Sequence, residues 1–266
     1  MYKYLLTNFF FVTLMGLTCP LQAATFHVDP QSGNDNHNGH TPQSAWATLN
    51  KASTSTYKPG DFILLKRGSV FKDQLALKDI NSTKDHPLLI DTYGPGEKMP
   101  VIDAQGYLAA VLIENCSHVI VKNIELTSDG GVAHEERAKT ERFGIYINKS
   151  REITATNLYT HTIFASTMTK SEGKAGMTAY GHGIRFDESH NILIQNCKIE
   201  KVGRYGLNGK KSHDVVIQNN KTDHTGCSGL QLGKCQNVVV RGNTFDHPGS
   251  AIDPRMHARG SGSWVW

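Results

Sequence analysis

One six-residue pattern recurs along the second half of this chain and limits the folds open to it. The pattern opens with a polar residue, runs through mostly apolar positions, and ends on Asn or Gly. Its copies are HVIVKN (118–123), NILIQN (191–196), DVVIQN (214–219) and NVVVRG (237–242), with a looser copy, EITATN, at 152–157. The last three copies begin at residues 191, 214 and 237 and are therefore spaced by 23 residues. A fixed period of this size indicates one small structural unit stacked on itself.

The earlier gaps between copies are longer than this period. The extra residues fall at 127–143 and 161–182, two stretches rich in Lys, Arg, Glu and His. In repeat folds such insertions leave the stack as loops, and these loops often form the binding face. We expect the two loops to wall a functional cleft, although mobile connections without a role would have the same composition.

The repeated unit has the composition of β-strands. The β-branched stretches at 215–217 and 238–240 favour an extended chain. A second short strand precedes the copies, at 144–147, 183–186, 206–209, 229–232 and 251–254, and polar turns join the two. Asn at the end of a copy suits a tight bend, because Asn tolerates positive φ. Amphipathic helix patterns, which helical solenoids need, do not recur at this period.

These features predict an all-β chain folded as a parallel β-helix, a single-stranded solenoid. Its coils should begin near residues 111, 144, 183, 206, 229 and 251. A β-sandwich is disfavoured, because it does not need the same turn in register in each repeat. Residues 24–110 would form an N-terminal cap and first coils, and residues 111–266 the repeated coils.

Stacking the coils predicts which side chains meet. Equivalent residues of successive coils lie about 4.8 Å apart. The inward positions of the first strand form one apolar column: Ile145, Ile147, Ile184, Phe186, Leu207, Leu230, Leu232 and Ile252. After the second strand, Asn220 and Asn243 share one position, where we expect an amide ladder along the stack.

The N-terminus has the pattern of a secretory signal at residues 1–23. Lys3 precedes an apolar stretch at 5–17, and small residues at 21–23 suit cleavage after Ala23. We therefore expect a secreted or periplasmic bacterial protein, with no membrane-spanning segment after removal of the signal. In that compartment Cys116, Cys197, Cys227 and Cys235 could form disulfides or remain buried free thiols.

The C-terminal residues 264–266 stop in what reads as the start of another coil. An end without a cap would expose a sheet edge and an apolar core. We therefore expect that C-terminal coils and a cap are missing from this chain.

The formal net charge of +4 is modest. It favours an acidic partner, and the lack of a dense Lys/Arg stripe argues against nucleic acid. We expect a monomer that binds a polysaccharide.

The residues before the repeats carry a family resemblance. Residues 26–30 (FHVDP), 32–35 (SGND), Trp46 and 59–68 (PGDFILLKRG) resemble the N-terminal segment of bacterial secreted right-handed parallel β-helix proteins that act on polysaccharides. Those proteins include pectate and alginate lyases and glycoside hydrolases. The resemblance implies a right-handed helix, in line with the usual crossover preference. We interpret Asp35 as a structural turn residue.

The resemblance says less about chemistry. Lyases of this kind commonly use Lys and Arg with a calcium ion held by carboxylates, and their acidic calcium motif has no clear match here. The resemblance alone thus implies calcium as a possible cofactor, and the residues that would bind a metal are unknown. Gly181-His182-Gly183 matches an element of polygalacturonases, but the paired aspartates of those enzymes are missing, so we interpret His182 as a turn residue. Residues 253–262 resemble a motif of uncharacterised members of the family.

Outward positions of the first strand predict a polar wall on the molecule. One row is Tyr146, Arg185, Asn208, Gln231 and Asp253, and the next is Asn148, Asp187, Lys210, Gly233 and Arg255. Such a wall suits a sugar chain lying along the stack, and an ordinary solvated sheet face is the alternative. We expect substrate contacts from Tyr146, Asn208, Arg255, His257 and Arg259.

The turn before the first strand supplies a third set of polar residues. Glu200, Asp223 and Asp246 are equivalent, and so are Lys201, His224 and His247. Stacked carboxylates repel one another, so one should have a raised pKa or share a cation. Such a group would serve as a proton donor or a calcium ligand. A surface ladder of Asp and His is the alternative.

These sets predict one cleft along the first strand and its preceding turn, with Lys210, His224, Arg185, Asp187 and Asp223 as catalytic candidates. The leading hypothesis is a lyase that cleaves an acidic polysaccharide by β-elimination. Lys210 or His224 would be the base, and Arg185 and Arg255 would neutralise the carboxyl group. The alternatives are a glycoside hydrolase using two of Asp187, Asp223 and Asp246, or a non-catalytic β-helix at the cell surface.

Overall fold

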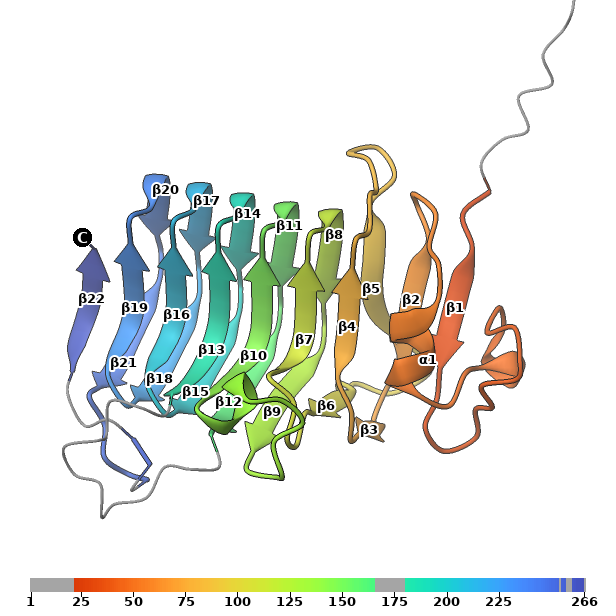
Figure 1. Cartoon of the computed structure of the whole chain (residues 1–266), viewed down its shortest axis with the longest axis horizontal. Helices are drawn as coiled ribbons and strands as arrows, with labels where there is room; N and C mark the ends of the chain where they lie inside the picture. Colours follow the sequence, from red (N-terminus) through yellow and green to blue (C-terminus); the bar gives the residue numbers. More distant parts are fainter. Residues whose placement is uncertain (1–21, 166–179, 254, 257–259, 266) are drawn as a thin grey trace, which may run out of the picture.

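The computed structural model describes residues 22–165, 180–253, 255–256 and 260–265. In these residues the chain winds into three parallel sheets that run the length of the molecule (Figure 1). Sheet A contains β1 (Thr25–Val28), β2 (Phe62–Lys66), β5 (Leu88–Tyr93), β8 (Ser117–Lys122), β11 (Arg151–Thr156), β14 (His190–Gln195), β17 (His213–Gln218) and β20 (Gln236–Arg241). Sheet B contains β3 (Val70–Phe71), β6 (Val101–Asp103), β9 (Glu125–Asp129), β12 (Tyr159–Phe164), β15 (Lys198–Val202), β18 (Lys221–Thr225) and β21 (Thr244–Pro248). Sheet C contains β4 (Leu75–Lys78), β7 (Ala109–Glu114), β10 (Glu141–Asn148), β13 (Tyr180–Asp187), β16 (Tyr205–Lys210), β19 (Ser228–Gly233) and β22 (Ser261–Val265).

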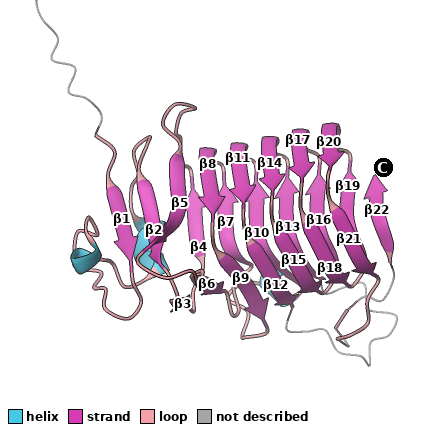
Figure 2. Ribbon diagram, turned by 180° about the vertical axis from the view of Figure 1, so that it is seen from behind, coloured by secondary structure: helices cyan, strands magenta, loops and turns pink. Residues whose placement is uncertain are grey.

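From β4 to β21, each coil contributes a strand to sheet C, then to sheet A, then to sheet B. Neighbours within a sheet are parallel and come from successive coils, as in the series β11, β14, β17 and β20 that Figure 2 shows from behind. This is the parallel β-helix that the sequence predicts, and the six-residue copies are the strands of sheet A.

The bends between sheets A and B follow the predicted chemistry. Asn123, Asn157, Asn196 and Asn219 all have positive φ, between 50° and 62°. Asn pays little for this conformation, so the same residue type recurs where each coil must turn sharply.

The strands of sheet B could not be recognised from the sequence, because their residues have the composition of polar turns. In β18, Thr222 and Thr225 are buried, whereas the two residues between them face outward. The alternation is broken because His224 has φ 49°. A two-residue period cannot be recognised across such a break. The segment that carries Glu200, Asp223 and Asp246 is therefore a strand in each coil, and the prediction of a turn is wrong.

The apolar column predicted for the first strand forms the core of the helix. Seven of its members, from Ile145 to Leu232, are at most 1% exposed. Ile252 is 58% exposed, so its assignment to the core is wrong. The last coil does not begin near 251: β22 at Ser261–Val265 pairs with β19 instead. A strand at 251–254 would have placed Pro254 in the ladder, and proline has no amide hydrogen to donate there.

The predicted amide ladder is present at the second bend. Asn220 donates from Nδ2 to Asn243 Oδ1 at 2.9 Å and accepts from the backbone amide of Cys197 at 2.9 Å. Asn220 is 2% exposed, and these bonds satisfy polar atoms that would be costly to bury alone.

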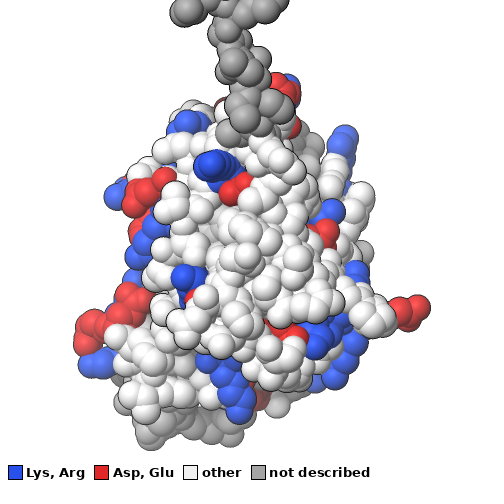
Figure 3. Space-filling view, turned by 90° about the vertical axis from the view of Figure 1, so that its right-hand side faces the viewer, with Lys and Arg blue, Asp and Glu red and all other residues white. Residues whose placement is uncertain are grey.

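The N-terminal end of the stack is covered. The short helix α1 (Leu49–Thr54) and the buried ring of Trp46 lie over the first coils, and Figure 3, which views this end, shows mostly uncharged surface with charges towards the rim. Asp35 accepts hydrogen bonds from the amides of Ala47 (2.8 Å) and Thr48 (3.0 Å). Its role here is structural, as its sequence context predicts.

The four cysteines in the described residues are free thiols. Cys116 and Cys235 occupy the same turn position in different coils. In the three coils between them this position is filled by Ser150, Ser189 and Ser212, whose hydroxyl groups accept hydrogen bonds along the stack. These three coils therefore separate the two thiols. Within the described part of the chain, no helix is long and apolar enough to cross a membrane.

Candidate functional site

Four successive strands of sheet C, β10, β13, β16 and β19, have a glycine at the same register position. A Cβ on Gly144 would lie 2.2 Å from Thr160 Cγ2, and one on Gly183 would lie 2.4 Å from Ile199 Cγ2. Each of these glycines therefore faces the interior, where there is no room for a side chain, and the side chain of the residue before it faces outward. An outer column of Phe143, His182 and Tyr205 results, with ring centroids 5.3–5.4 Å apart.

The two predicted polar rows are present over four coils of sheet C. Tyr146, Arg185, Asn208 and Gln231 are register neighbours, and so are Asn148, Asp187, Lys210 and Gly233. The rows do not continue to Asp253 and Arg255, because the strand that continues the sheet begins at Ser261. Arg255 instead donates to Asp253 and Asp129 and lies over the ring of Phe164, 3.9 Å from its centroid.

A hydrogen-bonded chain links two carboxylates on this face. Arg185 Nε donates to both oxygens of Asp187, at 2.9 and 3.0 Å. The Tyr146 hydroxyl donates to Asp187 Oδ2 at 3.2 Å and accepts from Arg137 Nη1 at 3.2 Å. Arg137 Nε in turn donates to Glu141. Asp187 is only 13% exposed, so its position is well defined.

The loop between β9 and β10 forms one wall of this face. Its 3-10 turn η2 (Arg137–Lys139) places Ala138 against the outer column, and the guanidinium of Arg137 lies 4.9 Å from the ring centre of Tyr146. Arg137 and Glu141 of the predicted loop 127–143 thus line a hollow on this face, and a functional role of the loop stays a prediction. Most of the other predicted loop, 166–179, lies outside the described residues.

Two adjoining hollows follow the rows. The larger, about 450 Å³, is lined by Arg137, Glu141, Tyr146, Asn148, Lys149, Arg185, Asp187, Glu188, Lys210 and Lys211. The smaller, about 160 Å³, is lined by Arg185, Arg204, Tyr205, Asn208, Gly209, Lys210, Gln231 and Gly233. They share Arg185 and Lys210. The lining of the smaller hollow, as far as the structure describes it, has three cationic side chains and no carboxylate.

Burial sets the protonation of two groups here. It raises the pKa of the Tyr146 hydroxyl, and the charge of Asp187 adds to this against the opposing effect of Arg137. Tyr146 is therefore a hydrogen donor at neutral pH. Burial, followed by the charges of nearby guanidinium groups, holds the pKa of His182 well below its usual range. His182 is thus a neutral ring inside β13, and its interpretation as a turn residue is wrong.

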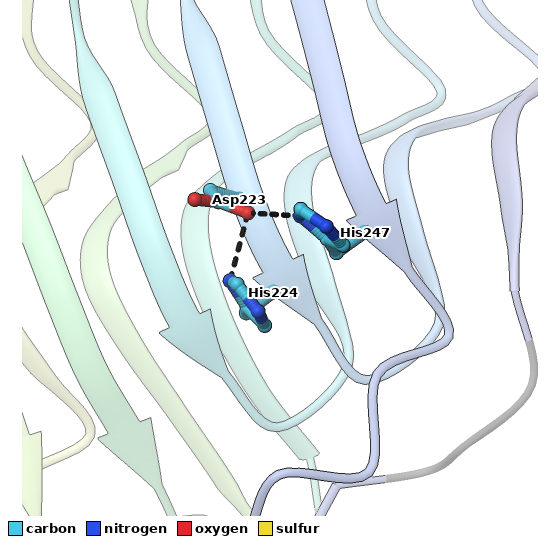
Figure 4. Close-up of side chains that lie close together, drawn as sticks. All are labelled: Asp223, His224 and His247. Atoms are coloured by element: carbon cyan, nitrogen blue, oxygen red, sulfur yellow. Dashed lines mark hydrogen bonds and ion pairs between the residues drawn. The ribbon is translucent and has the colours of Figure 1, made fainter.

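A second cluster lies on sheet B. Asp223 Oδ1 is 2.8 Å from His224 Nδ1 and 2.9 Å from His247 Nδ1, as Figure 4 shows. The sequence predicts that one carboxylate of this set has a raised pKa or shares a cation; for Asp223 and Glu200 the pKa is lowered instead of raised. Burial alone would raise both pKa values, but hydrogen bonds and charges from His247 and His224 lower that of Asp223, and bonds from Lys198 and Tyr159 lower that of Glu200.

The structure separates the predicted cleft into these two sites. Asp187 ends β13, where the chain turns into sheet A, whereas Asp223 and His224 lie in β18, before the chain turns into sheet C. The eight residues of β13 span roughly 25 Å at about 3.3 Å per residue. One glycosidic bond therefore cannot contact both Asp187 and Asp223. His257 and Arg259 lie outside the described residues.

Sequence reasoning missed three residues of the sheet C site: Arg137, Glu141 and Arg204. The loop that carries Arg137 could be identified from the sequence, but its composition does not show which of its charged side chains points into the hollow. Aligning the repeats one position further, to the residues before each repeat glycine, would have revealed the outer column of Phe143, His182 and Tyr205 beside Arg204.

Comparison with known proteins agrees with the architecture. Residues 105–263 match the family described as a right handed beta helix region. The chain belongs to this right-handed β-helix family. The solenoid is therefore right-handed, as the sequence resemblance implied.

Individual relatives of this β-helix chain act on carbohydrates. A lacto-N-biosidase of Bifidobacterium longum subsp. longum is 24% identical over 258 residues, covering 71% of this chain and 16% of that protein. The crystal structure of a GH136 lacto-N-biosidase from Eubacterium ramulus has a TM-score of 0.66 and 23% identity, covering 79% of this chain and 43% of that one. A rhamnogalacturonan lyase has a TM-score of 0.64 and 14% identity, covering 92% of this chain and 63% of that one. The chain thus spans less than half the length of each of the two lacto-N-biosidases, and the likeness to the two solved structures is one of fold.

Proposed function

We propose that this chain is a glycoside hydrolase that binds a glycan with an anionic group along the outer face of sheet C. The observation that carries the proposal is the pair of carboxylates, Asp187 and Glu141, that line one hollow and are linked through Tyr146 and Arg137. Hydrolysis of a glycosidic bond commonly uses two carboxyl groups that flank it. The similarity to lacto-N-biosidases favours hydrolysis over the elimination expected from the sequence.

The surroundings of the two carboxyl groups differ. Asp187 receives bonds from a guanidinium and a phenol, which hold it in place and suit the ionised partner, nucleophile or base. Glu141 accepts from Arg137, which belongs to the covering loop. Movement of that loop on binding would release Glu141 from Arg137, and the freed carboxyl group could then take up a proton from water and pass it to the leaving oxygen.

The smaller hollow supports an anionic substrate. Arg185, Arg204 and Lys210 line it together, beside the ring of Tyr205. The guanidinium of Arg204 lies 4.6 Å from the centre of that ring. Clustered cations of this kind bind carboxylate or sulfate groups, and Arg does so with a defined geometry. A sugar carrying such a group would sit next to the carboxylate pair.

The proposal is tested by the products formed from defined glycans. The full chain is incubated with anionic and neutral oligosaccharides, and new reducing ends are measured together with the ultraviolet absorbance of unsaturated sugars. We expect new reducing ends from an anionic substrate without a rise in absorbance. A rise in absorbance would mean that the chain is a lyase, and binding without turnover would mean that it is a binding protein.

We also infer that the chain is exported and cleaved after Ala23. The backbone nitrogen of Ala24 donates to Asp61 Oδ1 at 2.8 Å, and Asp61 is 2% exposed. After cleavage this nitrogen would be a charged amine, and its bond to the carboxylate would become an ion pair. Intact mass of the protein recovered from the periplasm or medium should correspond to a chain beginning at Ala24. Recovery of the uncleaved chain from the cytoplasm alone would contradict this.

A further inference from the structure

The left-handed backbone conformation of His224 in sheet B turns two neighbouring side chains to the same side. Residues in a regular strand alternate between its faces. In β18, however, the left-handed conformation of His224 lets Asp223 and His224 both face outward between the buried Thr222 and Thr225. The same conformation recurs in the next coil, where His247 has φ 42° and sits beside His224.

This repetition brings three donor atoms together. The rings of His224 and His247 stack with centroids 4.5 Å apart, and both Nδ1 atoms point at Asp223 (Figure 4). The donor atoms of the three residues all lie within 4.8 Å of one another. Among the described residues this is the one group of three His, Cys, Asp or Glu that meets this criterion.

We propose that Asp223, His224 and His247 form a binding site for a divalent first-row transition metal ion, with Zn²⁺ as the type ion. Two imidazole nitrogens and one carboxylate oxygen are a donor set used for zinc with a fourth position open to water. Calcium requires six or more oxygen ligands, so this set does not suit it. The calcium site considered for this region from the sequence thus becomes a nitrogen-rich site for a softer ion.

The distances suit such an ion. Ligands bound at 2.0–2.1 Å in a tetrahedron lie roughly 3.4 Å apart. The present separations of 2.8 and 2.9 Å to Asp223 are shorter than this, and the limit of 4.8 Å for the whole set is longer. Small side-chain rotations would therefore complete the geometry. The ion would replace the hydrogens that the imidazoles now share with the carboxylate.

Access to the site also fits. The side chain of His247 is 67% exposed, which leaves the site open to solvent. The nearby Lys221 ion-pairs with Asp246, with Nζ 3.1 Å from Oδ2.

Sheet A provides a matched control. His190 and His213 also stack across neighbouring coils, with centroids 4.9 Å apart, and His213 Nδ1 lies 2.6 Å from Asp214. His190, His213 and Asp214 resemble the sheet B residues in type and exposure. Their donor atoms, however, do not all lie within 4.8 Å of one another, as those of the sheet B site do. A His213→Ala variant therefore removes a comparable surface histidine without touching the proposed ligands.

The experiment is calorimetric titration of the full chain, without a histidine tag, with ZnCl₂. We expect saturable binding of one ion per chain, at least about tenfold weaker in Asp223→Asn, His224→Ala and His247→Ala and unchanged in His213→Ala. Co²⁺ should give the visible absorption of a low-coordinate nitrogen and oxygen site, and His247→Ala should abolish it. Circular dichroism of each variant checks that the fold is retained.

Three results would overturn the proposal. They are the absence of saturable Zn²⁺ binding, undiminished affinity in both Asp223→Asn and His247→Ala, and an equal loss of affinity in His213→Ala. Because these readouts involve no glycan, they are independent of the proposed hydrolase activity.

Discussion

Replacement of Asp187 by Asn is expected to reduce glycan turnover by roughly a hundredfold or more, as is typical when a catalytic acid or base is removed. Asn keeps the shape of the side chain and an acceptor for Arg185, so the melting temperature should change little. Glu141→Gln should have a comparable effect, because the mechanism needs both carboxyl groups. The measurement is the rate of reducing-end release from the substrate identified with the unmodified chain.

Asp246→Asn is the matched control for this pair. Asp246 lies on sheet B and pairs with Lys221, away from the sheet C hollows. Its substitution should leave the rate near normal. If Asp187→Asn and Glu141→Gln retain full activity while Asp246→Asn loses it, the catalytic carboxyl groups are on sheet B and our assignment is wrong.

Leu207→Asp is expected to abolish folding. Leu207 is fully buried, and it lies between Ile184 and Leu230 in the apolar column of sheet C. A buried charge without a partner costs several kcal/mol, a large part of the 5–15 kcal/mol that typically stabilises a domain. In a stacked fold the damage passes to both neighbouring coils, since each coil is stable only against the next. We expect loss of soluble protein and of a cooperative thermal transition.

A charge at a neighbouring outward position separates burial from a general effect of aspartate. Ile217 is fully buried in β17, whereas the adjacent Val216 faces the solvent side of sheet A. Ile217→Asp should fail to fold like Leu207→Asp, and Val216→Asp should remain folded. A soluble Leu207→Asp or Ile217→Asp protein that melts cooperatively would show that the inward assignment is wrong.

Much of the architecture could be predicted from the sequence because β-helix coils share one register. Once the copies that end in Asn196 and Asn219 are aligned, the equivalences as far as Asn243 follow, including the Asn220–Asn243 ladder and the row from Tyr146 to Gln231. Each side chain in such a stack repeats its environment about 4.8 Å further along. A periodic sequence therefore specifies neighbours without knowledge of the rest of the fold.

The candidate sites were less predictable, because they depend on departures from the repeat. The left-handed residues His224 and His247 break the alternation of sheet B, so a polar strand reads as a turn and the convergence on Asp223 is hidden. The insertion before β10 brings Arg137 onto Tyr146, and this contact is fixed by the path of a loop that the 23-residue repeat does not contain.

The sequence by itself thus determined the stacking, the core column and the rows of outward residues, because these follow from local period and register. Only the tertiary structure decided that Asp187 and Asp223 lie on different faces, that Glu141 joins Asp187, and that the last strand of sheet C begins at Ser261. These outcomes depend on the angles between sheets and on the course of inserted loops. Long-range packing sets both, and a repeat of 23 residues carries no information about it.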